Sequence, residues 1–141
     1  MFGGCLSPTN RPGQMLFKSA DGAGGLVNYL TKSLENFIAR HKVFEEVNPV
    51  QCFPLSDILA ALGVSRVDFL SLDVHGAEST ILQTIDFNKL RIYILVMEVY
   101  DDSPTKKRLL MAKMHHFMNR TGVYRLEREF EFDMIFKRID I

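Results

Sequence analysis

The sequence predicts an α/β fold with a mostly parallel central sheet and antiparallel edge strands. Residues 69–73 form a nearly continuous apolar run, typical of a strand covered on both faces, and residues 91–100 are rich in β-branched and aromatic side chains. Helical patterns follow both runs, and residues 124–136 alternate between apolar and charged side chains. Strand, helix, strand, helix and edge strands is the order of an α/β sheet with right-handed crossovers.

The composition fits one domain with a buried core. The chain has 141 residues, of which 47% are hydrophobic and 24% are charged. Its 17 Lys and Arg residues equal its 17 Asp and Glu residues, so the overall charge gives no case for nucleic acid or an acidic membrane as a partner. No apolar run approaches the roughly 18 residues of a transmembrane helix, and residues 1–10 lack the pattern of a secretory signal. These features do not indicate a cellular compartment for the protein.

The first 25 residues are rich in glycine and proline. Two prolines and a glycine in residues 7–13 predict a loop or tight turn. Residues 14–20 could form a short strand, which the glycine-rich residues 21–25 would break. Cys5 and Cys52 form no CxxC motif, and two packed thiols are the favoured interpretation.

A helix, an extended segment and a second, short helix are expected next. Apolar residues recur at helical spacing over residues 26–40, which predicts an amphipathic helix. Two prolines hold residues 47–55 in an extended conformation. Ser56 is then expected to cap a helix that runs through Leu62, with Gly63 at the position after its end.

The second half begins its long helix with clear signals. Ser103 is expected at the N-cap, Pro104 at the first helical position and Gly122 beyond the far end. The alternation in residues 124–136 predicts strands with one wet face, which are expected to be antiparallel and at an edge. Their apolar face would consist of Tyr124, Leu126, Phe130, Phe132, Met134 and Phe136.

Acidic residues stand where the two apolar runs end. In open parallel sheets, ligands bind beyond the carboxyl ends of the strands. Asp73 and Glu98 lie near those ends of consecutive strands, so both should face the same rim. Gly76 lets the chain turn sharply and lets a ligand approach the backbone, and Glu78 falls where the helix dipole favours an anion. The alternative is that Asp73 or Glu78 only caps the helix, but two acids at adjacent strand ends favour a site.

A metal site is an alternative for the same residues. Oxygen and imidazole ligands from Asp73, His75, Glu78 and Glu98 would suit several divalent ions. Asp73 and His75, however, lie only two residues apart at a turn, and no second histidine joins them. The sequence therefore assigns no metal.

Residues 67–99 resemble the signature segment of the FkbM-type methyltransferases. That family is similar in having an aspartate-bearing strand, then Val-Glu-Gly-Ala-Glu, a short helix, and a strand that ends in Val-Glu-Val. The corresponding letters here are DVHGAE at residues 73–78 and MEV at residues 97–99. Residues 50–70 and 133–138 also resemble the family, and the Star-like animal branch is particularly similar.

The resemblance implies a Rossmann-like methyltransferase that uses S-adenosylmethionine and methylates a hydroxyl of a small molecule or glycan. It implies that Asp73, His75 and Glu78 are catalytic. It also implies that Asp73 and Gly76 bind the cofactor and that Glu98 binds the substrate. These residues would orient the acceptor or help to remove its proton. The family has Glu where this chain has His75. An imidazole can accept a proton near neutral pH, so His75 could be a base; the alternative is that it marks a site that has drifted.

The cofactor loop is the main departure from the family. Methyltransferases of this fold hold their cofactor on a Gly-rich loop after the first strand and on an acid that ends the second. Residues 22–25, GAGG, are the only Gly-rich candidate, and we interpret them as a plain loop because no buried strand leads into them. Residues 2–13 resemble the family's third strand. Residues 1–141 are thus expected to form one partial domain that lacks two βα units, on the order of 60 residues.

A partial sheet would leave an unpaired strand edge beside residues 69–73. It could survive by dimerising through this edge, or by covering the edge with the helix expected at residues 26–40. Two hypotheses therefore remain. One is an S-adenosylmethionine-dependent methyltransferase of the FkbM type, incomplete in this chain. The other is a non-catalytic, Star-like interaction or trafficking module that keeps the fold.

Overall fold

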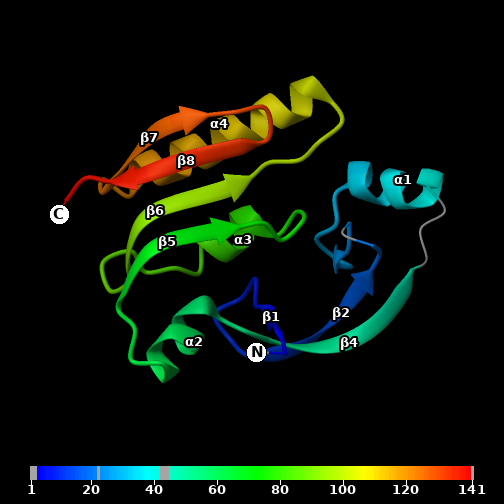
Figure 1. Ribbon diagram of the computed structural model, residues 1–141, viewed down its shortest axis with the longest axis horizontal. Helices are drawn as coiled ribbons and strands as arrows, with labels where there is room; N and C mark the ends of the chain where they lie inside the picture. The colour runs from blue at the N-terminus through cyan, green and yellow to red at the C-terminus, as the bar shows by residue number, and fades with distance from the viewer. Residues whose placement is uncertain (1–2, 22, 42–44, 141) are drawn as a thin grey trace.

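The computed structural model describes residues 3–21, 23–41 and 45–140. Over these residues the chain has a mixed α/β architecture with two four-stranded sheets (Figure 1). In chain order the elements are β1 (Cys5–Leu6), β2 (Gly13–Ser19), β3 (Gly25–Leu26), α1 (Lys32–His41), β4 (Glu46–Phe53), α2 (Leu55–Ala61), β5 (Arg66–Leu72), α3 (Glu78–Leu82), β6 (Arg91–Glu98), α4 (Pro104–Arg120), β7 (Tyr124–Glu129) and β8 (Asp133–Arg138).

Both sheets are mixed. The first has the order β1-β4-β2-β3, in which β1 and β4 are parallel and the other pairs are antiparallel. The second has the order β5-β6-β8-β7, in which β5 and β6 are parallel and the other pairs are antiparallel. The expected parallel arrangement is thus limited to one pair in each sheet of the described chain. A short turn joins β7 to β8, and such a connection makes an antiparallel pair.

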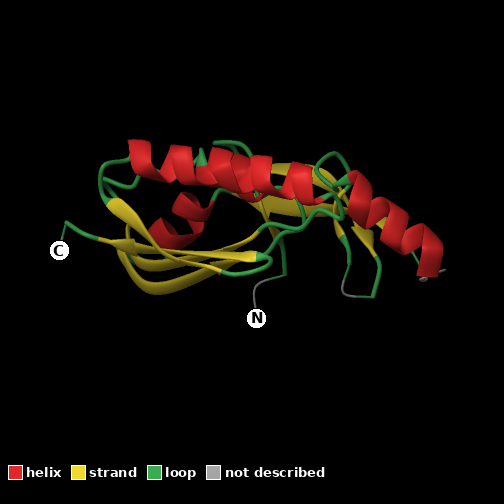
Figure 2. Cartoon of the chain, turned by 90° about the horizontal axis from the view of Figure 1, so that it is seen from above, coloured by secondary structure: helices red, strands yellow, loops and turns green. Residues whose placement is uncertain are grey.

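The main core lies between the second sheet and the helices α3 and α4. Figure 2 shows the long helix α4 above the strands. Three methionines of α4 are buried, as are Ile81 and Leu82 of α3. These side chains share one apolar cluster with the sheet residues Leu72, Ile92, Leu95, Met97, Met134 and Phe136. Packing of helices on the sheet is what the order of elements predicts.

β5 forms an edge of the second sheet. It pairs with β6 on one side, and no strand among the described residues pairs with its other side. Phe69, in the middle of β5, is 61% exposed. The expectation of a strand covered on both faces is therefore wrong, because the face that carries Phe69 meets solvent. The open edge itself agrees with the expectation of an unpaired strand.

α1 begins later than its periodicity predicts. The helix starts at Lys32 rather than at residue 26. Leu26 belongs to β3 instead, where it pairs with Phe17 of β2. The amide of Val27 also donates a hydrogen bond to the carbonyl of Leu16. Pairing with β2 thus removes residues 26 and 27 from the helix that their apolar spacing alone predicts.

α2 begins two residues earlier than expected. Its first residue is Leu55, so Pro54 stands at the N-cap and Ser56 lies inside the helix. The expected capping by Ser56 is therefore wrong, because the fixed φ of Pro54 already suits a helix start. Gly63 has a φ of +68° and follows the helix end, as predicted.

α4 begins as the sequence predicts. The Ser103 hydroxyl accepts a hydrogen bond from the amide of Lys106, and Pro104 is the first helical residue. Gly122, with a φ of +72°, lies just beyond the helix end. None of the helices in the described ranges combines the length and the apolar character needed to cross a membrane.

The hairpin of β7 and β8 is antiparallel, as predicted, and β7 lies at the sheet edge. Tyr124, Met134 and Phe136 point into the core. Phe130 does not share this face: it is 51% exposed, because it lies in the turn between the two strands. A strict alternation cannot hold across a turn.

Cys5 and Cys52 form a disulfide bond, which corrects the expectation of two packed thiols. The two residues are register partners in the parallel pair of β1 and β4, and their Cα atoms lie 4.4 Å apart. This separation falls in the range that a disulfide requires. The bond ties the two-residue strand β1 to the eight-residue strand β4.

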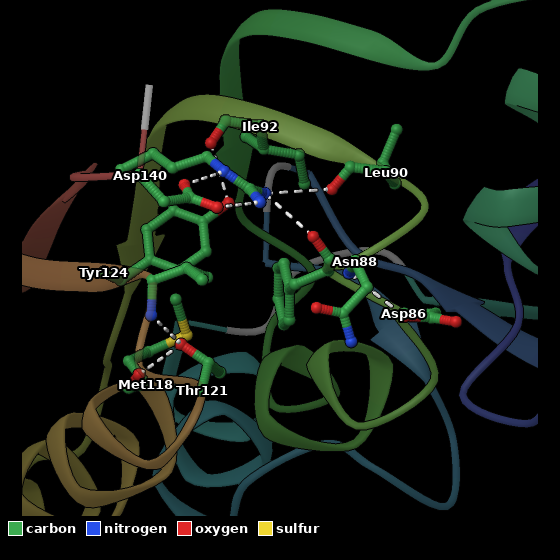
Figure 3. A network of polar contacts seen from close by, with 11 residues as sticks. Asp86, Asn88, Leu90, Ile92, Met118, Thr121, Tyr124 and Asp140 are labelled. Carbon is green, nitrogen blue, oxygen red and sulfur yellow. Dashed lines mark hydrogen bonds and ion pairs between the residues drawn. The ribbon is translucent and has the colours of Figure 1, made fainter.

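A buried arginine network closes the second sheet at the end opposite to the carboxyl ends of β5 and β6 (Figure 3). Arg138 Nη1 donates to the carbonyl oxygen of Leu90 at 3.3 Å, and Nη2 donates to Asp140 Oδ2 at 2.8 Å. The Tyr124 hydroxyl donates to the carbonyl oxygen of Ile92 at 2.7 Å. Because a buried guanidinium needs such partners, the network holds β6, β7 and β8 in place.

Candidate functional site

The carboxyl ends of β5 and β6 form one acidic rim. Leu72 and Met97 are register partners in this parallel pair, so Asp73 and Glu98 follow side by side. One side-chain nitrogen or oxygen atom from each of Asp73, His75 and Glu98 lies within 4.8 Å of the other two. The expectation that both acids share one rim is confirmed, and the turn after β5 adds the histidine to them.

A hydrogen bond from the loop before β3 orients His75. Its Nδ1 lies 2.6 Å from the carbonyl oxygen of Gly24, and because a carbonyl only accepts, Nδ1 carries the proton. The other ring nitrogen, Nε2, lies 3.4 Å from Asp73 Oδ1 and 4.0 Å from Glu98 Oε2. A neutral His75 therefore presents an unprotonated nitrogen to two carboxyl groups.

Glu78 holds the turn between β5 and α3. Its side chain is buried, Oε1 accepts a hydrogen bond from the amide of Val74, and Oε2 accepts one from the amide of Gly76, each at 2.9 Å. Burial raises the pKa of Glu78 above its usual value, and these backbone hydrogen bonds oppose the rise. Both carboxylate oxygens are engaged by the backbone, which favours the structural role that the sequence left open.

Gly76 accommodates a close approach of the protein's own backbone. Its φ is +113°, and a Cβ atom at this position would clash with the carbonyl oxygen of Tyr29. Gly25 is crowded in the same way, since a Cβ there would lie 3.3 Å from the Cβ of His75. The two glycines let the segment before α1 pack against the rim turn. The sequence predicts a ligand near Gly76, and in the structure the Tyr29 carbonyl lies there.

Among the described residues, His75 is the one basic partner of the carboxyl groups at the rim. Burial, followed by the Asp73 carboxylate, raises the pKa of Glu98 to about 7. Within the described part of the chain, neither Asp73 nor Glu98 forms an ion pair with Lys or Arg. A carboxyl group with a pKa near neutrality is suited to acid–base chemistry.

An open cavity of about 580 Å³ adjoins the rim. Asp73 and His75 line one part of it, and Phe17 and Leu26 of the first sheet line another. This volume is in the range of small-molecule sites, roughly 300–1,000 Å³. On another side of His75, Glu98 borders a smaller cavity of about 60 Å³. Asp73 and His75 thus stand beside enough space for a ligand, and Glu98 lies behind them.

Sequence reasoning missed what the first sheet contributes. Gly24 and Gly25 line the cavity, although the glycine-rich segment was interpreted as a plain loop; Gly22 lies outside the described residues. Adjacent glycines do signal close packing, but they do not say which segment packs against them. The hydrogen bond between Gly24 and His75 joins residues 51 positions apart, and no local pattern announces it.

Polar groups at the carboxyl ends of parallel strands, beside a cavity, mark the usual ligand site of α/β proteins. A model of the methyltransferase FkbM domain matches residues 10–132. This match covers most of the chain, so the chain belongs to the FkbM methyltransferase family, and its mixed α/β architecture is consistent with a methyltransferase-like fold. No curated protein and no solved structure gives a significant match.

Proposed function

We propose that the protein transfers a methyl group from S-adenosylmethionine to a hydroxyl oxygen of a small molecule or glycan. Membership of the FkbM methyltransferase family supports this class of reaction. The observation that carries the proposal is the convergence of Asp73, His75 and Glu98 at a rim that opens onto a cavity of about 580 Å³. A rim of this kind can orient an acceptor and take up its proton.

The rim suits the methyl-bearing end of the cofactor. When bound, S-adenosylmethionine supplies a methyl group on a positively charged sulfur. The Asp73 carboxylate at the cavity wall, with Glu98 behind His75, would attract this charge. The Gly24 and Gly25 backbone offers a further wall without side chains. The donor set therefore fits the reactive end of the molecule.

The positions of the rim residues suggest their roles. The Asp73 side chain is 56% exposed and would hydrogen-bond the acceptor hydroxyl. The unprotonated Nε2 of His75 would receive the hydroxyl proton when the acceptor oxygen is methylated. Glu98 would bind the acceptor and stabilise the resulting imidazolium. Glu78 acts as a positioning residue, because it holds the turn that carries His75.

We further propose that the second sheet corresponds to one half of a Rossmann-like methyltransferase sheet. β5 lies at its edge, where the first strands of such a sheet would pair. The cavity lies between this region and the first sheet, since Val74 and Leu6 both line it. The Gly-rich turn and the ribose-binding acid would then come from two βα units outside residues 1–141. The chain alone would bind the cofactor weakly.

Replacement of Asp73 tests the proposed reaction. Asp73→Asn should leave the fold intact and lower methyl transfer at least tenfold, because it removes a negative charge and an acceptor at the rim. Asp68→Asn, at an exposed position on β5, is the matched control and should leave transfer unchanged. Circular dichroism would report folding, and release of S-adenosylhomocysteine would report transfer.

Two outcomes would count against this role. Unfolding of Asp73→Asn would make Asp73 structural, and unchanged transfer would remove it from the reaction. Calorimetric titration with S-adenosylmethionine tests cofactor binding separately. No heat from this chain, followed by saturable binding once a Gly-rich strand-turn-helix is restored ahead of it, would support an incomplete enzyme.

A non-catalytic, Star-like interaction or trafficking module is the second candidate, and the free edge of β5 favours it. The 61% exposed Phe69 lies on β5, whose outer edge pairs with no strand in the described part of the chain, and such an edge is a template for pairing with another strand. Sedimentation velocity should show self-association that Phe69→Lys abolishes. Leu109→Lys, at a similarly exposed apolar residue of α4, should not change it. A monomer at all concentrations would contradict pairing of two copies through this edge.

A further inference from the structure

We propose that Asp73, His75 and Glu98 bind one divalent transition-metal ion at the rim, a role that the sequence did not assign. The proposed binding depends on the geometry of these three side chains. A role of this ion in methyl transfer depends, in addition, on the function proposed above.

The distances between the donor atoms suit a single ion. Bonds of about 2.0–2.2 Å from a metal to nitrogen or oxygen place ligand atoms about 3.0–3.5 Å apart in octahedral or tetrahedral geometry. Nε2 of His75 lies 3.4 Å from Asp73 Oδ1, inside this range, and 4.0 Å from Glu98 Oε2. Both acid side chains are partly exposed, so a small rotation of Glu98 would shorten the longer distance.

The second nitrogen of His75 is bonded as in a metal-binding histidine. Histidine ligands almost always donate their other N–H to a carbonyl or carboxylate, which fixes the tautomer and the ring orientation. Here Nδ1 donates to the carbonyl oxygen of Gly24 at 2.6 Å. The contact comes from a segment 51 residues away, so it is independent of the turn that carries the ligand. It directs the lone pair of Nε2 toward both carboxyl groups.

The charges at the rim call for a cation. Two carboxyl groups and the Nε2 atom of His75 meet there; in the neutral imidazole Nε2 carries a lone pair, and mutual repulsion of such groups is unfavourable. In an ordinary structural cluster, Lys or Arg would balance them. Across the described ranges, the ion pairs of Asp73 and Glu98 involve His75 alone. A divalent ion would replace the repulsion with three favourable bonds.

The ligand set indicates the class of ion. One imidazole with two carboxylates suits Mn²⁺, Fe²⁺, Co²⁺ or Zn²⁺ better than Ca²⁺ or Mg²⁺, which prefer oxygen ligands only. Three protein ligands leave coordination positions open, and the 580 Å³ cavity reaches Asp73 and His75 from one side. A hydroxyl bound at an open position would lose its proton more easily. With the ion bound, the proton acceptor differs from the one proposed above: His75 would be a ligand, and the free oxygen of Asp73 would take the proton.

Titration of the metal-free full chain with Co²⁺ tests the proposal, because the visible absorption of Co²⁺ reports its ligands directly. We expect one ion per chain. His75→Asn, Asp73→Asn and Glu98→Gln should each weaken binding at least tenfold. Asn is chosen at position 75 because His75 has a φ of +53°, a conformation that Asn tolerates.

Two control variants separate this site from adventitious surface binding. Asp68→Asn on β5 and His116→Asn on α4 change exposed residues away from the rim and should leave Co²⁺ binding unchanged. Binding that survives His75→Asn but falls in His116→Asn would overturn the proposal. Absence of Co²⁺ binding by the wild-type chain would overturn it too.

A further measurement needs no variant and therefore does not depend on how the variants fold. Added Mn²⁺ should broaden the imidazole NMR signals of His75 before those of His115 and His116. Broadening confined to the latter two would contradict the site. Absence of methyl transfer by a wild-type chain that binds both Co²⁺ and S-adenosylmethionine would count against the proposed function and would leave the metal site standing.

Discussion

At the rim, two consecutive residues have positive φ angles, +53° for His75 and +113° for Gly76. The resulting reversal directly after β5 brings the imidazole back toward the carboxyl groups of the strand ends. The Glu78 carboxylate fixes this reversal through two backbone amides. The geometry of the rim thus depends on residues that need not take part in any chemistry, as is general for preorganised sites.

Gly76→Ala should destabilise the fold more than Gly63→Ala. Both glycines have positive φ angles, so either change introduces backbone strain of about 1–2 kcal/mol. Only at Gly76 would the added methyl group meet backbone, the carbonyl of Tyr29. We expect the free energy of unfolding to fall by a further 1 kcal/mol or so. Urea denaturation of both variants measures the difference. Equal losses of unfolding free energy would show that the Tyr29 carbonyl does not pack tightly against Gly76.

Asp140 should make stability depend on pH at acid values. Hydrogen bonds from Arg138 hold the pKa of Asp140 below its usual value of 3.8. The unfolded chain therefore binds this proton first, so the contribution is present above the usual value and is lost as the pH falls through the lowered one. In Asp140→Asn, urea midpoints should decline less between pH 5 and pH 2 than in the wild type. An identical decline in both chains would exclude this pair as a cause.

Among the elements, β1 depends most on a covalent link. It has two residues, and its pairing with β4 is crossed by the disulfide between Cys5 and Cys52. A bond that closes a loop of 47 residues restricts the unfolded chain, which corresponds to about 2–4 kcal/mol. Reduction should lower the free energy of unfolding by this amount. The double variant Cys5→Ser, Cys52→Ser should have the same free energy of unfolding as the reduced wild type, and reductant should not change it.

Elements with strong local signals could be predicted from the sequence, and those decided by distant partners could not. The N-cap at Ser103 depends on neighbouring residues, and the structure confirms it. The start of α1 depends on whether Leu26 finds a strand partner, and that partner, Phe17, is not part of the helical pattern. Tertiary pairing of this kind overrides periodicity.

At the scale of the whole molecule, the order of the strands predicts the rim but not the residues that surround it. Acids at the ends of consecutive parallel strands must share a rim, which is why Asp73 and Glu98 could be placed together from the sequence. The rest of the cavity comes from the first sheet, whose docking against the rim turn uses Gly24 and Gly25. Glycine has no side chain to mark its partner, so the packing of the two sheets was not foreseeable.

The carbonyl of Gly24 has a consequence for any attempt to transplant the rim. A graft of residues 66–98 into another scaffold would carry Asp73, His75 and Glu98 but would leave behind the acceptor that orients the imidazole. The ring would then be free to rotate, and its two nitrogens would exchange places. A functional graft must therefore also include the hairpin of β2 and β3, which contains Gly24.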